Sequence, residues 1–195
     1  MNVVDKMARL AMIVHNGVNR KGPDNVPYIV HPHAVVSLLK EWGYTEQDDP
    51  VTLSVAWGHD ILEDTDTPES EILAVDKKLG ERILAGVKML TFKSEGALSD
   101  AEYDRRKAEY IEKVAETAPP EIIAVKIADR LCNVADFGRC DYARAYYRLG
   151  QALYARIKDC KHASRMEASR RAVADALADF CQLDNARGNA AVFGC

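Results

Sequence analysis

Apolar residues recur at helical spacing along almost the whole of this 195-residue chain. One apolar stripe consists of Val3, Met7, Leu10 and Val14, and stripes with the same period follow within residues 35–42 and 53–61. Residues three and four positions apart lie on the same face of a helix, so such stripes are typical of amphipathic helices. The sequence lacks the alternating pattern of a half-buried strand. We therefore predict an all-α protein with about eight helices.

Prolines and capping residues indicate where several of these helices begin. Proline fits the first position of a helix because its missing N–H group would have no partner there. The segment from Ser99 to Glu102 has the pattern of a capping box. Residues 15–30 form the longest stretch that we expect to be irregular. Three helix starts, each with a capping residue before the proline, are expected at His31-Pro32, Asp49-Pro50 and Thr67-Pro68.

The composition is that of one folded domain. With 48% hydrophobic and 29% charged residues, the chain can bury a sizeable core. It has no internal repeat and no low-complexity linker, so we expect a single domain over residues 1–195, with residues 185–195 as a loosely held tail. With a modest net charge of −4, the chain has no overall field that would draw it to nucleic acid or an anionic membrane, and an anionic ligand would need a local basic pocket.

The cysteines and the N-terminus bear on the cellular compartment. The five cysteines form an odd set without a CxxC pair, which argues against a disulfide framework or a zinc knuckle and favours a reducing compartment. The first residues carry charges too frequently for a signal peptide, and no apolar run reaches the length of a transmembrane helix. We therefore expect a cytoplasmic protein.

Four polar residues interrupt an apolar run, SVAWGHDILEDT, at residues 54–65. If this run were one helix, His59 would stand over Glu63 and Asp60 over Asp64, because residues i and i+4 share a face. Acids near the C-terminal end of a helix oppose its dipole by several tenths of a kcal/mol each. The concentration of these groups therefore indicates a functional site.

Two residues from other parts of the chain are candidates for the same site. His31 lies at a predicted helix start, and Asp129 is a lone acid within an apolar helical run. Together with His59 and Asp60 they form a nitrogen and oxygen ligand set without thiolate, which suits a divalent metal with open positions. The alternative is that Asp129 pairs only with Lys126 or Arg130. The remaining histidines, His15, His33 and His162, are expected to be hydrogen-bonded core residues.

These residues carry a resemblance to the HD-domain phosphohydrolases, in which a distant histidine, an adjacent His-Asp pair and a later aspartate hold the metal. More narrowly, the chain is similar to the hydrolase domain of the RelA/SpoT alarmone enzymes and to the small alarmone hydrolases, their single-domain relatives. The resemblance spans roughly residues 2–160 and implies an HD-type helical bundle. The matching segments are RKGPDNVPYIVHP (20–32), HDILEDT (59–65) and KIADRLCNV (126–134).

The resemblance implies hydrolysis of the 3′-pyrophosphate of guanosine tetra- or pentaphosphate (ppGpp or pppGpp). The products would be GDP or GTP plus pyrophosphate, and the usual metal would be Mn²⁺. A divalent cation can activate a water molecule and offset phosphate charge. Glu63 and Asp64 follow the metal-binding pair closely enough to orient that water and exchange its proton.

The same resemblance implies a set of nucleotide contacts. Arg20 would place its guanidinium on the base and Lys21 would contact phosphate, whereas the alternative is that both are solvated loop charges. Asn133 matches a position that contacts the nucleotide. Tyr146 would support the ribose or base, although Tyr147 could take that place.

Two other functions are compatible with these residues. The first is an HD phosphohydrolase that acts on a nucleoside monophosphate, an adenosine alarmone or NADPH. The second is a metal-free module that binds alarmones, although binding alone would not need all six of the candidate metal and catalytic residues. The partner in each enzymatic alternative is a small nucleotide, and the sequence leaves base preference and oligomeric state open.

Overall fold

The structure of the protein is a computed structural model. It describes the backbone of residues 1–20, 25–93, 96, 98–136 and 139–192, and side chains as far as residue 183. Among these residues it contains no β-strand, apart from an isolated antiparallel bridge between Asn19 and Pro27. The prediction of an all-α fold is therefore confirmed.

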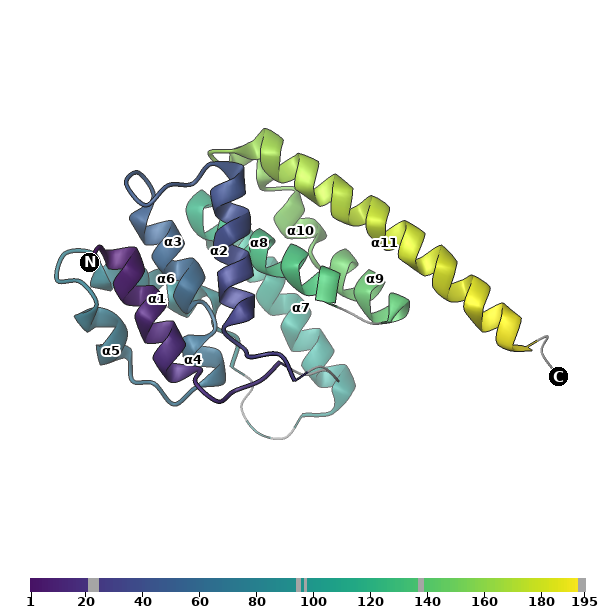
Figure 1. The fold of residues 1–195 in the computed structure, drawn as a ribbon, viewed down its shortest axis with the longest axis horizontal. Helices are drawn as coiled ribbons and strands as arrows, with labels where there is room; N and C mark the ends of the chain where they lie inside the picture. The colour runs from purple at the N-terminus through teal and green to yellow at the C-terminus, as the bar shows by residue number, and fades with distance from the viewer. Residues whose placement is uncertain (21–24, 94–95, 97, 137–138, 193–195) are drawn as a thin grey trace.

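The helices follow one another in a compact bundle (Figure 1). Within the described residues, eight α-helices have nine or more residues, which agrees with the expected number, and three shorter ones lie between them. The α-helices are α1 (Val3–Val14), α2 (Val30–Trp42), α3 (Pro50–Gly58), α4 (Ile61–Asp64), α5 (Glu69–Ala74), α6 (Gly80–Leu90), α7 (Asp100–Thr117), α8 (Pro120–Asp136), α9 (Cys140–Leu149), α10 (Gln151–Tyr154) and α11 (Ala163–Val192); a 3-10 helix, η1 (Ile157–Asp159), precedes α11.

Helix α8 lies at the centre of the bundle. It contacts α2, α3, α6, α9, α10 and α11, and every residue from 122 to 131 is buried. A helix enclosed on all sides needs apolar residues all round. Lys126, Asp129 and Arg130 are the exceptions in this segment, and each of them must find a polar partner, since an unpaired buried charge is costly.

The observed helix starts agree only in part with the expected ones. Asp49 occupies the N-cap position of α3, without a capping hydrogen bond from its side chain, and Pro50 is the first residue of that helix. The Ser99 side chain accepts a hydrogen bond from the backbone N–H of Glu102 at the start of α7. In contrast, α2 begins at Val30, so Pro32 is its third residue, and Pro68 precedes α5 in the capping position. Both differences are tolerated because the first four N–H groups of a helix have no partner within it.

Helix α11 runs along one end of the bundle, and its C-terminal part extends away from it (Figure 1). Its backbone is helical as far as Val192, and it contacts α8, α9 and η1. The side chains from residue 184 onward lie outside the described residues, so the single domain over 1–195 and the loosely held tail over 185–195 stay predictions. None of the helices in the described part of the chain has the length and apolar character needed to cross a membrane.

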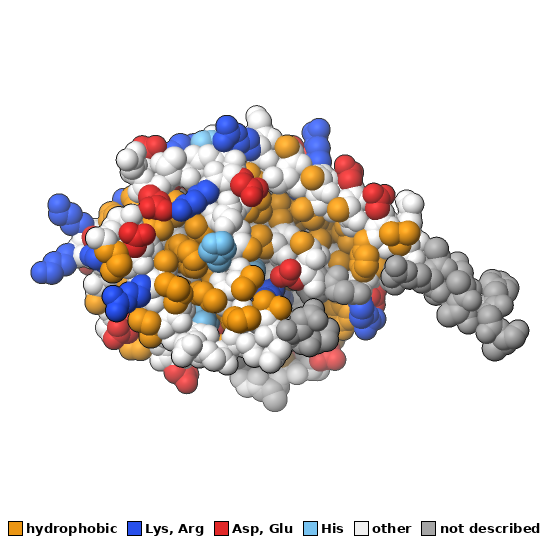
Figure 2. All heavy atoms as spheres, viewed as in Figure 1, with side chains coloured by type: hydrophobic (Ala, Val, Ile, Leu, Met, Phe, Trp, Pro, Cys, Tyr) orange, Lys and Arg blue, Asp and Glu red, His pale blue; other side chains and the backbone are white. Residues whose placement is uncertain are grey.

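Apolar side chains gather over the middle of the face shown in Figure 2, and charged side chains lie mainly around its outline. The exposed large apolar side chains of the protein include Met12 and Ile13 of α1 and Val30 of α2. Apolar atoms make up more than half of the surface of ordinary folded proteins. We therefore assign no function to this apolar surface.

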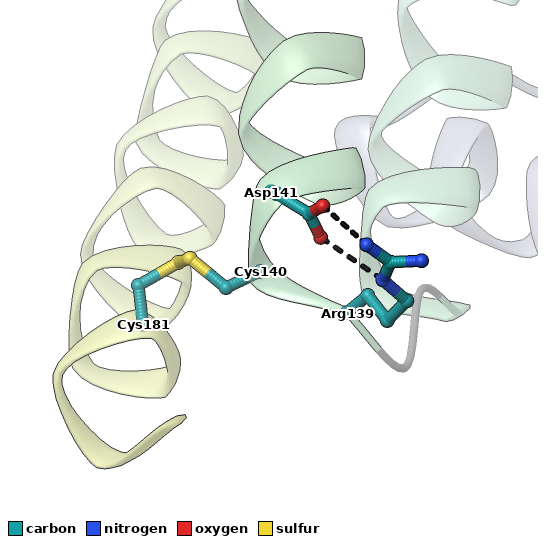
Figure 3. The surroundings of a disulfide bond; sticks show 4 residues. All are labelled: Arg139, Cys140, Asp141 and Cys181. Carbon is teal, nitrogen blue, oxygen red and sulfur yellow. Dashed lines mark hydrogen bonds and ion pairs between the residues drawn. A yellow bond between two sulfur atoms is a disulfide. The ribbon is translucent and has the colours of Figure 1, made fainter. Parts of the chain in front are cut away.

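A disulfide joins α9 to α11, so the expectation from cysteine spacing was wrong (Figure 3). Cys140 and Cys181 are 41 positions apart in the sequence, but the packing of the two helices brings their Cα atoms to 5.1 Å and their sulfur atoms to 1.98 Å. Sequence spacing does not report such a pairing, because tertiary packing alone creates it. Among the described residues, Cys132 and Cys160 carry free thiols.

This pairing predicts the number of titratable thiols. Of the five cysteines, two are in the disulfide, so protein denatured without reductant should expose three thiols, and reduced protein should expose five. Removing a partner should raise the count: Cys181→Ser frees Cys140 and leaves four thiols, whereas the control Cys132→Ser leaves two. Loss of a cross-link that closes a loop of this length should lower the free energy of unfolding by roughly 2–4 kcal/mol. Five thiols in unreduced protein would show that the bond does not form.

Candidate metal centre

Four side chains from three parts of the chain meet beside α8. His31 lies in the first turn of α2, Asp129 lies in the middle of α8, and His59 and Asp60 lie between α3 and α4. The expectation of one continuous helix through residues 54–65 is wrong, because α3 ends at Gly58 and α4 begins only at Ile61. His59 and Asp60 keep right-handed helical backbone angles at this break, and their side chains meet at one point.

The polar ends of both aspartates lie within 3.7 Å of both histidines. His59 Nε2 lies 3.3 Å from His31 Nε2 and 3.0 Å from Asp60 Oδ2. Asp129 Oδ1 lies 3.1 Å from His31 Nε2 and 3.7 Å from His59 Nε2. Donor atoms of His31, His59 and Asp60 all lie within 4.8 Å of one another, which is the spacing of a group that could hold a metal ion.

The hydrogen bond on the far side of His59 orients its ring. Its Nδ1 lies 2.7 Å from the carbonyl oxygen of Ala56, which can only accept, so Nδ1 carries a proton and Nε2 is the ring nitrogen that faces the cluster. Burial lowers the pKa of the His59 imidazole, but the Asp60 and Asp129 carboxylates more than offset this effect and raise it to about 10. The two carboxylates therefore favour a positive charge at this place, and a divalent cation held by the nitrogen and oxygen donors would take the place of the His59 Nε2 proton.

Asp129 has further partners that hold both of its oxygens. Its Oδ2 forms an ion pair of 2.9 Å with Lys126 Nζ, and its Oδ1 accepts a hydrogen bond of 2.6 Å from Asn133 Nδ2. Burial would raise the pKa of the Asp129 carboxyl, but Lys126, His31 and His59 hold it well below its usual range. Asp129 therefore pairs with Lys126 through Oδ2 and at the same time approaches the histidines through Oδ1.

Sequence reasoning missed Tyr28, which lies in the irregular segment before α2. Its hydroxyl donates a hydrogen bond of 2.6 Å to Asp60 Oδ2. Periodicity gave no signal here because the segment is not helical. Lys107 and Lys126 were also missed as residues of the site, although a lysine within the apolar run of α8 was a usable signal.

Three of the four side chains, those of His31, Asp60 and Asp129, line a cleft of about 450 Å³, and His59 is fully buried beside them. A separate hollow of about 560 Å³, lined by Tyr44, Asp49 and Glu121 among others, has no histidine among its described lining residues, so we place the candidate site in the smaller cleft. The lining of the cleft comprises Val18, Asn19, Arg20, Tyr28, His31, Asp60, Glu63, Asp64, Lys107, Lys126, Asp129, Asn133, Asp136 and Tyr146.

Glu63 and Asp64 both line this cleft but differ in their surroundings. The Glu63 carboxylate lies 3.2 Å from Lys107 Nζ and accepts a hydrogen bond of 2.8 Å from the backbone N–H of Phe92. Asp64 is exposed. Burial, together with the neighbouring Lys126, lowers the pKa of Lys107, whose ammonium group lies 4.4 Å from the centre of the Phe92 ring.

The expected nucleotide contacts lie on the side of the cleft nearest the end of α8. Arg20 Nη2 donates to Asn133 Oδ1 at 2.9 Å and pairs with Asp136 Oδ2 at the same distance. Asn133 Nδ2 lies 3.2 Å from the hydroxyl of Tyr146. Lys21 lies outside the described residues.

The two neighbouring tyrosines have different surroundings. Tyr146 lines the cleft, and its ring lies 3.8 Å from the guanidinium carbon of Arg130. Tyr147 instead packs against the core, where its hydroxyl accepts a hydrogen bond of 2.7 Å from Arg170. Of the two alternatives, Tyr146 is therefore the one that lines the cleft.

The other three histidines do not all match the expectation of a hydrogen-bonded core residue. His15 is buried, but neither of its ring nitrogens has a hydrogen-bond partner among the described residues. His33 is exposed and lies beside the Trp57 ring, and His162 is half-buried. Only the burial of His15 therefore agrees with the expectation.

The chain is similar in sequence to a known protein family and to named members of it. A family model described as HD domain matches residues 8–180. A protein of Danio rerio named guanosine-3′,5′-bis(diphosphate) 3′-pyrophosphohydrolase MESH1 is 33% identical over 126 residues, which are 65% of this chain and 64% of that protein. The chain thus spans slightly less than two thirds of this relative. The protein of the same name from Xenopus tropicalis is 33% identical over 134 residues, or 68% of each chain.

A solved structure shows the same fold. It is described as a metazoan ortholog of SpoT that hydrolyses ppGpp, and it matches with a TM-score of 0.70 over 89% of this chain and 94% of that chain. The sequence identity is 21%, so this likeness supports the arrangement of the helices rather than any particular substrate.

Removal of Asp129 tests whether the four side chains act as one metal site. Asp129→Ala should purify with much less metal. It should retain its helical circular dichroism, because apolar contacts between the helices, and not the Asp129 carboxylate, build the core. Asp136→Ala is the matched control, since this acid lies on the same helix and lines the same cleft but pairs with Arg20. Metal content measured by mass spectrometry should fall in the first variant only. Equal occupancy in both would remove Asp129 from the ligand set.

Proposed function

This chain belongs to the HD-domain family, and we propose that it removes the 3′-pyrophosphate of ppGpp or pppGpp, giving GDP or GTP plus pyrophosphate. The observation that carries the proposal is the convergence of four side chains, those of His31, Asp60 and Asp129 in the lining of one cleft and that of the buried His59 beside them. The names of the relatives from Danio rerio and Xenopus tropicalis support the choice of substrate.

We propose His31, His59, Asp60 and Asp129 as the ligands of a divalent cation, with Mn²⁺ as the metal. Imidazole and carboxylate donors are common to several divalent metals, so the choice of Mn²⁺ rests on the family resemblance. When bound, the cation would supply a nucleophilic water and neutralise charge on the phosphoryl oxygens.

The excess of carboxylates over cationic side chains in the cleft supports a role for such a cation in binding an anionic substrate. Its lining carries five carboxylates and three cationic side chains, those of Arg20, Lys107 and Lys126. Carboxylates repel a polyphosphate, and a divalent cation would reverse that balance at the point where the reaction occurs. The two lysines lie on the side of Glu63 and Asp129, where they are placed to attract phosphate oxygens.

Glu63 and Asp64 are proposed to handle the protons of the reaction. Water attacks the phosphorus joined to the 3′ oxygen, the bond between that phosphorus and the 3′ oxygen breaks, and the 3′ oxygen takes up a proton. The exposed Asp64 carboxylate is free to exchange a proton with solvent, whereas Lys107 and the Phe92 N–H hold Glu63 in a fixed direction. Positioned carboxylates of this kind serve as general acids and bases.

The nucleotide itself is proposed to lie toward Arg20. The Arg20 guanidinium would stack on the base, Asn133 and Tyr146 would contact the nucleoside, and Lys21 would contact phosphate. The hydrogen bond from Arg20 to Asn133 and its ion pair with Asp136 support this role, since they hold the guanidinium at the edge of the cleft. We also propose that the protein acts in the cytoplasm, a reducing compartment in which the Cys140–Cys181 disulfide would have to persist.

The products and two conservative variants test this function. With ppGpp and Mn²⁺, the protein should release pyrophosphate in one step and leave GDP, as followed by ion-exchange chromatography. Glu63→Gln and Asp64→Asn should retain metal and nucleotide binding, and at least one should lose roughly 10²- to 10⁴-fold in kcat, the usual contribution of an acid–base group.

Parallel reactions with adenosine alarmones, NADPH and nucleoside monophosphates distinguish this function from other HD phosphohydrolase activities. The proposal requires that ppGpp or pppGpp gives the highest kcat/KM in this panel. Release of orthophosphate before pyrophosphate, or wild-type rates in both amide variants, would contradict it.

A further inference from the structure

We infer that Tyr28, held in place by His15, is a positioning residue that fixes the Asp60 carboxylate for metal binding. The inference rests on the proposed metal site and concerns two residues that are neither proposed ligands nor members of the proposed acid–base pair. Side chains that hydrogen-bond to metal ligands orient them and commonly change metal affinity 10- to 100-fold when removed.

Tyr28 is linked to two of the four proposed ligands. Its hydroxyl donates to Asp60 Oδ2 at 2.6 Å, and this is the same oxygen that lies 3.0 Å from His59 Nε2. A carboxylate oxygen has two lone pairs, so one can face the cluster while the other accepts from the phenol. In addition, the backbone carbonyl of Tyr28 accepts a hydrogen bond of 3.0 Å from the N–H of His31.

The main chain around Tyr28 is fixed although it is not helical. The backbone N–H of Tyr28 donates to Val18 O at 2.8 Å, and the N–H of Arg20 donates to Val26 O at the same distance. These bonds flank the bridge between Asn19 and Pro27. The segment that carries Tyr28 is therefore tied to the segment that follows α1.

His15 provides the surface on which the Tyr28 ring rests. The two rings are stacked with their centres 4.6 Å apart and an angle of 26° between their planes. His15 is only 3% exposed, and its ring nitrogens have no hydrogen-bond partner among the described residues. Burying such a ring without a partner costs free energy, so its contact with Tyr28 gives a reason for its presence.

Asp60 needs such support because it lies at the break between helices α3 and α4. It is the residue before α4, and its backbone carbonyl accepts the N–H groups of Glu63 and Asp64, but its side chain does not cap that helix. The Tyr28 hydroxyl therefore supplies the Asp60 carboxylate with a directional hydrogen bond that the nearby backbone of α4 does not. Without it, the carboxylate could rotate away from His59.

The test is the affinity of the whole protein for Mn²⁺, measured by equilibrium dialysis without nucleotide. Tyr28→Phe keeps the stacked ring and removes only the hydroxyl, and its dissociation constant should rise about 10- to 100-fold. Turnover of the variant should recover as Mn²⁺ is raised. Tyr44→Phe is the matched control, since the Tyr44 hydroxyl is also buried but has no hydrogen-bond partner among the described residues and lines the separate hollow.

A double-mutant cycle tests the part assigned to His15. His15→Ala should weaken Mn²⁺ binding in the wild-type background and should have little further effect in Tyr28→Phe, because coupled residues are not additive. Additive effects would show that His15 does not act through Tyr28.

The outcomes separate this inference from the proposed function. If the wild-type protein binds no Mn²⁺, both fail. If the wild type binds Mn²⁺ and Tyr28→Phe binds it equally well, only the inference fails. A raised KM for ppGpp with unchanged Mn²⁺ affinity would likewise overturn it, because the hydroxyl would then act on the nucleotide.

Discussion

The mutual approach of two imidazole rings and two carboxylates in a buried place is the constraint on which the rest of the site depends. Removing charged groups from water is costly by several kcal/mol each unless they are paired. Lys126 offsets one of the carboxylates, and the remaining negative charge favours a cation between His31, His59 and Asp60. The helices around this point bury both histidines, and a cleft beside them is lined by His31, Asp60 and Asp129.

Periodicity predicted the all-α fold because it is a local property of the sequence. The candidate ligands were recognisable for a related reason: Asp129 is an acid in an apolar run, and the His59-Asp60 pair interrupts another. Tyr28 gave no such signal, since it lies in a segment without periodicity and its role depends on a contact 32 positions away. The Cys140–Cys181 bond was missed because it depends on the packing of two helices.

The break between α3 and α4 shows how a local departure from regular structure serves the site. A continuous helix would have placed the acids in two columns, with Glu63 beside His59. Instead, Glu63 turns to Lys107 and the Phe92 N–H, and Asp64 stays exposed at the cleft. The two acids that the sequence presents as equivalent are thus given different surroundings, in keeping with a division of proton-transfer work between them.

The location of a bound metal is the most direct test of this account. Crystals grown with Mn²⁺ should give an anomalous difference peak within roughly 2.0–2.3 Å of His31 Nε2, His59 Nε2, Asp60 Oδ2 and Asp129 Oδ1, the usual range for nitrogen and oxygen ligands of such cations. Asp60 should keep its hydrogen bond from Tyr28 in that structure. A peak at another place, or a peak in the cleft with Asp129 turned toward Lys126 alone, would contradict the account.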